Sequence, residues 1–148
     1  MKPRTRILAI DPGSVRLGLA ISDTERRFAS PLLTYTRRDP TEDALFFKKI
    51  VEAEEVGAIV IGLPIHEDGH EGGQAKAART FGAWLQEVTG LPCVFYDERF
   101  TSFEADFSLE QAGLTKKKRK ARRDQIAAQI LLQTYLDAEC HSSEPRTQ

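Results

Sequence analysis

The chain has little cysteine, no long apolar run and almost no net charge. Its two cysteines, Cys93 and Cys140, are too few for a disulfide scaffold or a cysteine-based zinc site, and we expect Cys93 to be a buried, reduced thiol. No apolar run approaches the roughly 20 residues of a membrane-spanning helix. The apolar stretch after the basic N-terminus, residues 7–10, is too short for a signal peptide. We therefore expect a cytoplasmic protein with no membrane partner.

Length and composition are typical of one globular domain. The chain has 148 residues, of which 41% are hydrophobic and 29% charged, enough to bury a core. We expect a single domain over residues 1–140 and a disordered polar tail over residues 141–148. The formal net charge of −1 excludes a polycation, but the dense basic block at residues 116–123 hints at an anionic partner. A solvated, mobile loop before the last helix explains that block equally well.

The order of apolar patterns predicts an α/β domain. Alternating or continuous apolar residues predict strands over residues 6–11, 16–22, 28–35, 58–62 and 91–97, the last two buried. Helical spacing and capping signals predict helices over about residues 40–56, 74–89, 101–113 and 124–138. The first two strands form an antiparallel hairpin, and Pro31 places a bend or an edge in the third. The order β-β-β-α-β-α-β-α-α predicts a mixed five-stranded sheet with helices on both faces.

Acidic residues interrupt apolar elements where a core disfavours charge. Asp11 ends the first strand, Asp97 and Glu98 end the last, and Asp124 begins the last helix on its apolar face. Such carboxylates are costly unless they are paired, protonated or metal-bound. Mg²⁺ prefers oxygen ligands, and a pair of such ions can activate water for phosphodiester hydrolysis. Taken singly, each acid has an ordinary alternative as a turn cap, a surface pair or a helix-dipole partner.

Three further features carry weaker signals. Strand parity puts Asp97 and Glu98 on opposite faces, so only one of them can face a metal unless a bend intervenes. Metal binding is conceivable for His66 and His70, but a solvated turn explains them better. Backbone N–H groups after Gly62 could cradle a phosphate.

Four segments resemble the motifs of the YqgF (RuvX) family. They are AIDPGSVRLGLA at residues 9–20, IVIGLP at 59–64 followed by Asp68-Gly69, DERFTS at 97–102, and DQIAAQILL at 124–132 followed by Tyr135-Leu136. The resemblance covers about residues 7–136. It implies a ribonuclease-H-like fold related to the RuvC Holliday-junction resolvases.

The resemblance also implies the site residues. By position, Asp11, Glu98 and Asp124 are its metal-binding catalytic carboxylates, with Mg²⁺ or Mn²⁺ as the cofactor. It implies substrate contacts from a set of cations: Arg16, Arg99, Lys117, Lys118, Arg119, Arg122 and Arg123.

Residues and resemblance together predict a metal-dependent nuclease. We expect it to process the 5′ end of pre-16S ribosomal RNA, with ribosomal precursor particles as a partner, and to leave a 5′-phosphate and a 3′-hydroxyl. A Holliday junction resolvase acting on branched DNA is the alternative within the same class. A non-catalytic nucleic-acid or ribosome-associated factor is the alternative from another class. An actin-like ATPase or sugar kinase is disfavoured, because it needs two such domains. Monomer and homodimer both stay open.

Overall fold

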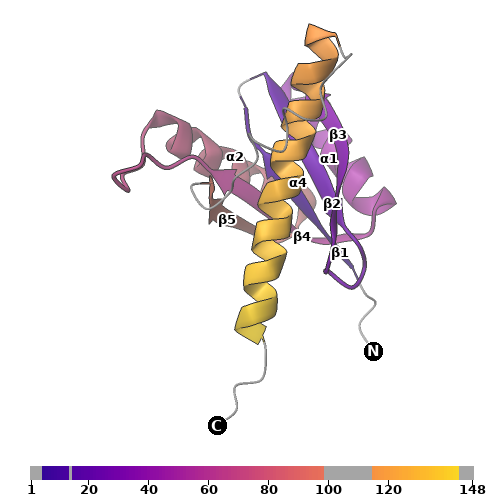
Figure 1. Ribbon diagram of the computed structural model, residues 1–148. Coiled ribbons are helices and arrows are strands. Elements are labelled where there is room, and N and C mark those ends of the chain that lie inside the picture. Colours follow the sequence, from indigo (N-terminus) through magenta and orange to yellow (C-terminus); the bar gives the residue numbers. More distant parts are fainter. Residues whose placement is uncertain (1–4, 14, 99–114, 144–148) are drawn as a thin grey trace.

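One mixed sheet forms the centre of the molecule (Figure 1). The computed structural model describes residues 5–13, 15–98 and 115–143. Within them the sheet has the order β3-β2-β1-β4-β5, which confirms the predicted five-stranded mixed sheet. The first three strands are antiparallel, whereas β4 pairs parallel with β1 and β5 pairs parallel with β4. The strands are β1 (Arg6–Asp11), β2 (Arg16–Ser22), β3 (Ala29–Thr36), β4 (Val56–Leu63) and β5 (Cys93–Asp97).

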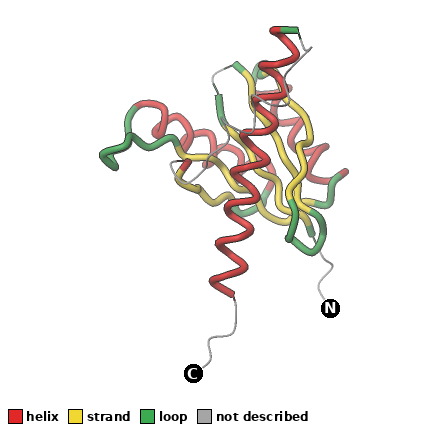
Figure 2. The backbone as a smooth tube through the Cα atoms, in the orientation of Figure 1, coloured by secondary structure: helices red, strands yellow, loops and turns green. Residues whose placement is uncertain are grey.

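Helices cover both faces of this sheet, and Figure 2 shows them on either side of the strands. They are α1 (Pro40–Ala53), α2 (Gly73–Thr89) and α4 (Lys116–Ser143). One core lies between the sheet and the first two helices, and includes Leu8, Ile10, Phe47, Ile61 and Leu85. A second core lies between the opposite face and α4, and includes Ile7, Ala9, Val60, Ala128 and Leu132. Alternate residues of β1 therefore face different helices, and the odd-numbered ones face α4.

Local signals explain most helix ends. The Asp39 side chain accepts a hydrogen bond from Glu42 N at 2.8 Å, so the predicted N-cap of α1 is confirmed. The first helix ends at Ala53, before the predicted stop, because Glu55 adopts a left-handed φ of 54° and β4 begins immediately after it. Gly90, with φ of 71°, ends α2 as predicted.

The last helix is longer than predicted at both ends. It begins at Lys116 and not at Asp124, so the basic block is helical and not a loop. Lys, Arg and Ala are good helix formers, and the Thr115 hydroxyl accepts a hydrogen bond from Lys118 N at 3.2 Å at its start. The helix continues to Ser143, so residues 141–143 of the predicted tail are helical. Residues 144–148 and the predicted helix over 101–113 lie outside the described residues.

The two strands at the edges of the sheet, β3 and β5, are less regular or less buried than the central strands. Pro31 lies in β3, an edge strand whose register shifts between Leu19 and Ala20 of β2, as its proline predicts. The other edge strand, β5, was expected to be buried, but Val94 is 39% exposed, since among the described residues β4 is the one strand that pairs with β5. Cys93 is half-buried, and this burial raises the pKa of its thiol to about 11. Within the described ranges, no helix is long and apolar enough to cross a membrane.

Candidate active site

Asp11 lies at the C-terminal end of β1, on the sheet face that α4 covers. Its neighbour in β2 is Gly18, and the preceding pair, Ile10 and Ile61, places Gly62 of β4 on its other side. Two residues without side chains thus flank one carboxylate. This leaves room for other groups to approach Asp11.

The two glycines let other groups reach Asp11. A Cβ atom at Gly18 would lie 1.9 Å from the backbone oxygen of Asp124, so α4 crosses directly over β2 at this point. A Cβ atom at Gly62 would lie 2.5 Å from Oε1 of Glu98, so the Glu98 side chain occupies that place. The first clash would force the α4 backbone to move, and the second would displace the Glu98 carboxylate. The glycines therefore bring Asp124 and Glu98 to Asp11.

The carboxyl groups interact with one another directly. Burial raises the pKa of Asp11 to about 9, with further contributions from a hydrogen bond to Glu98 and from the charges of Glu98 and Asp124. The charge of Arg123 opposes this rise. At neutral pH the Asp11 carboxyl therefore keeps its proton in the metal-free protein, and that proton holds two carboxyl groups together.

Asp124 faces a cation in addition to the other acids. Its Oδ2 lies 2.8 Å from Nε of Arg16, and its side chain is 24% exposed. Within residues 5–13, 15–98 and 115–143, no three Asp, Glu, His or Cys side chains meet the geometry of a metal site as they stand. A hydrogen-bonded pair (Asp11 and Glu98) and an ion pair (Asp124 and Arg16) occupy the four groups instead.

The remaining predicted site residues are an acid at the end of β5 and a set of cations. Of the alternatives at the end of β5, it is Glu98 that contacts Asp11. Arg99 lies outside the described residues. The first turns of α4 carry five of the predicted cations, all of them exposed: Lys117, Lys118, Arg119, Arg122 and Arg123. This end of α4 projects beyond the sheet (Figure 1).

The turn between β4 and α2 has no sign of a metal site. Both His66 and His70 are exposed, and their rings stack with centroids 4.2 Å apart. Nδ1 of His70 lies 2.7 Å from Oδ1 of Asp68, which closes the turn. The prediction of a solvated turn is confirmed.

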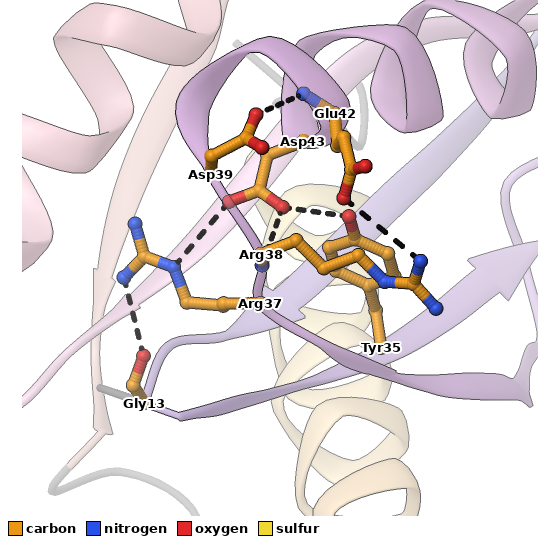
Figure 3. Close-up of polar contacts among 7 residues, drawn as sticks. All are labelled: Gly13, Tyr35, Arg37, Arg38, Asp39, Glu42 and Asp43. Atoms are coloured by element: carbon orange, nitrogen blue, oxygen red, sulfur yellow. Dashed lines mark hydrogen bonds and ion pairs between the residues drawn. The ribbon is translucent and has the colours of Figure 1, made fainter.

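A network that sequence analysis missed joins the β1–β2 turn to the start of α1 (Figure 3). The buried carboxylate of Asp43 accepts hydrogen bonds from the Tyr35 hydroxyl at 2.6 Å and from Arg38 N at 2.9 Å. Its Oδ2 lies 3.9 Å from Nε of Arg37, whose Nη1 donates to the Gly13 carbonyl oxygen at 3.4 Å. Burial and the contact with Asp43 raise the pKa of Tyr35 to about 12. Asp43 thus holds Arg37 beside the residues that follow Asp11.

Solved structures define the class of fold. RuvC of T. thermophilus, in complex with a Holliday junction substrate, matches with a TM-score of 0.56 at 15% identity, over 96% of this chain and 99% of that chain. The fowlpox virus Holliday junction resolvase matches with a TM-score of 0.52 at 10% identity, over 90% of this chain and 99% of that chain. The chain has the ribonuclease-H-like α/β fold, as predicted.

Sequence comparisons then identify the family. The model of the RuvX family, described as a Holliday junction resolvase, matches residues 5–138. A relative from Rhodopirellula baltica, named "Putative pre-16S rRNA nuclease", is 44% identical over 133 residues that cover 90% of this chain and 77% of the relative. A relative of the same name from Agrobacterium fabrum is 39% identical over 137 residues, which cover 93% of this chain and 86% of the relative. The chain belongs to the RuvX (YqgF) family, which confirms the resemblance.

Proposed function

We propose that this protein is a divalent-metal-dependent nuclease that processes the 5′ end of pre-16S ribosomal RNA. The observation that carries the proposal is the Asp11 carboxyl, hydrogen-bonded to Glu98 and close to the charge of Asp124. Three acids from separate elements gather at one point, and their mutual repulsion is a cost that a bound divalent cation would relieve. A nucleic-acid hydrolase uses such a set.

The residues present fit a divalent cation. The donors are all carboxylate oxygens, the ligands that Mg²⁺ and Mn²⁺ prefer. The proton that keeps Asp11 neutral is what a cation would replace, because a positive ion between the carboxyl groups removes the cause of the raised pKa. Asp11, Glu98 and Asp124 would hold the metal. When bound, it supplies an activated water and neutralises charge on the leaving oxygen of the phosphodiester.

The chain's own residues have separate tasks in this scheme. With a cation bound, Asp11 would be ionised, and Asp124 would face the cation in place of the guanidinium of Arg16. Arg16 would then be available to a phosphate oxygen, for which its planar donor group is well suited. The exposed cations on the first turns of α4 grip the nucleic-acid backbone beyond the sheet. Arg99 is assigned to the same task by its position in the family motif.

The names of the relatives support RNA as the substrate. Bacterial relatives at 39–44% identity carry a name that refers to pre-16S rRNA. With this substrate, the proposed location is the cytoplasm and the proposed partner is a ribosomal precursor particle. The description of the family model favours branched DNA instead, so a Holliday junction resolvase is the second candidate. Resolution of a symmetric four-way junction would also require a homodimer.

One assay separates the candidates. Purified protein is offered a 5′ segment of pre-16S RNA and a four-way DNA junction, each with Mn²⁺ or Mg²⁺. We expect cleavage of the RNA, with a 5′-phosphate on the product. Cleavage of the junction alone would replace the first candidate by the second. Folded protein that binds either substrate and cuts neither would indicate a non-catalytic binding factor.

A further inference from the structure

A cleft of about 380 Å³ opens beside the carboxylate cluster. It lies where β1 and β4 end, between the β1–β2 turn and α2. Its volume falls at the small end of the range for ligand sites. Glu98 forms part of its wall, and Pro12 and Gly13 follow Asp11 directly, so the cleft is continuous with the candidate active site.

Most of the residues in the cleft wall are apolar. Pro12 and Pro64 contribute from the ends of two strands, and Ala77, Ala78 and Phe81 contribute from one face of α2. Phe81 is 6% exposed. Walls of this kind exclude water from both faces of a planar ring and do not suit a hydrated ion.

The polar groups of the cleft are few and fixed. The guanidinium carbon of Arg37 lies 5.2 Å from the centre of the Phe81 ring, and the Gly13 carbonyl and the buried Asp43 hold this side chain in place (Figure 3). Gln74 adds one amide, which can donate and accept at once. Guanidinium planes stack on nucleobases, and amides read their edges.

We propose that this cleft takes one unpaired nucleobase next to the cleaved phosphate. The inference rests on the proposed nuclease function, because it is Glu98 that joins the cleft to the metal-binding carboxylates. A base stacked within a duplex cannot enter a cleft in the protein wall, whereas a single-stranded or extruded base can. The site would therefore select single-stranded nucleic acid over a fully paired duplex.

The test fills the cleft and measures binding without cleavage. Ala77 is exposed on α2, so Ala77→Leu adds bulk to the cleft and keeps helix propensity. Ala83→Leu is the matched control, because Ala83 is exposed on the same helix and does not line the cleft. Each substitution is combined with Asp11→Asn in the same protein, because Asp11→Asn is expected to block cleavage. Fluorescence anisotropy then gives the affinity for a short single-stranded RNA, the same sequence as DNA, and the RNA duplex.

We expect Ala77→Leu to weaken single-strand binding about tenfold, which corresponds to about 1.4 kcal/mol and to the loss of one stacked base. Duplex affinity should stay unchanged, and Ala83→Leu should change neither. A loss of affinity for both single-stranded RNA and DNA supports a site that contacts the base alone. A loss of affinity for the RNA only supports a site that also contacts the ribose. An unchanged single-strand affinity, or an equal loss for single strand and duplex, would overturn the inference. Because no step of this test depends on cleavage, its failure is distinct from failure of the proposed function.

Discussion

The raised pKa of Asp11 makes stability depend on pH in an unusual direction. In the folded, metal-free protein this carboxyl keeps its proton up to a pKa of about 9, whereas in the unfolded chain it ionises near the ordinary aspartate pKa of 3.8. The folded state therefore binds the extra proton between these values. Stability from this group is complete below the unfolded pKa and is lost as the pH rises towards the folded pKa. The slope is about 1.4 kcal/mol per pH unit.

Asp11→Asn removes this dependence, because the amide is neutral at every pH and can still donate to Glu98. Between pH 6 and pH 8 the wild type should lose on the order of 2–3 kcal/mol of unfolding free energy that the variant retains. For a chain of this size that is roughly 5–10 °C in melting temperature. Thermal unfolding in EDTA, followed by circular dichroism at both values of pH, measures the difference.

Glu87→Gln is the matched control, since it removes one exposed carboxylate from α2 and should follow the wild type. Adding Mn²⁺ should flatten the pH dependence of the wild type, because bound cation replaces the proton on Asp11. Equal pH dependence in wild type and Asp11→Asn would show that the carboxyl pair does not share a proton, and would refute the reasoning.

Three further variants test other parts of the structure. Gly18→Ala should lower the free energy of urea unfolding by about 1–3 kcal/mol and abolish cleavage, because the added Cβ atom meets the α4 backbone. Gly73→Ala is the control, because Gly73 has open space around it, and it should change neither property. Removing Lys117 and Lys118 should lower the salt dependence of single-strand binding by roughly 0.7 per charge and leave cleavage at saturating RNA intact. Asp39→Ala should cost about 1 kcal/mol in urea unfolding, as expected for the loss of a helix cap.

Apolar patterning was enough to predict the sheet and its helices, because central strands such as β4 are continuous apolar runs and the helices carry apolar residues at helical spacing. The structure departs from the prediction where contacts with distant parts of the chain determine how an element is buried or where it begins. An unbroken apolar pattern cannot show that β5 lies at the edge of the described sheet. A run of like charges favoured a loop at residues 116–123, but the helix propensity of Lys and Arg prevailed, and their side chains are exposed.

The candidate site, too, was predictable from the sequence only in part. Acids that end apolar elements could be found from sequence, as could their cations, but their pairing could not. The contact between Asp124 and Arg16 joins residues far apart in the chain. Glycines inside strands offered a usable signal of close approach, and Gly18 and Gly62 both mark one. Asp43 has no such signal, because it reads as an ordinary acid in the first turn of a helix.

The most direct test of the account is cleavage of the pre-16S RNA segment by wild type, Asp11→Asn and Asp124→Asn, each with Mn²⁺ and with EDTA. We predict that the wild type cleaves the RNA in Mn²⁺ and not in EDTA, and that neither variant cleaves it although both remain folded. Cleavage that persists in EDTA, or in either variant, would contradict a metal-dependent site built from these carboxylates.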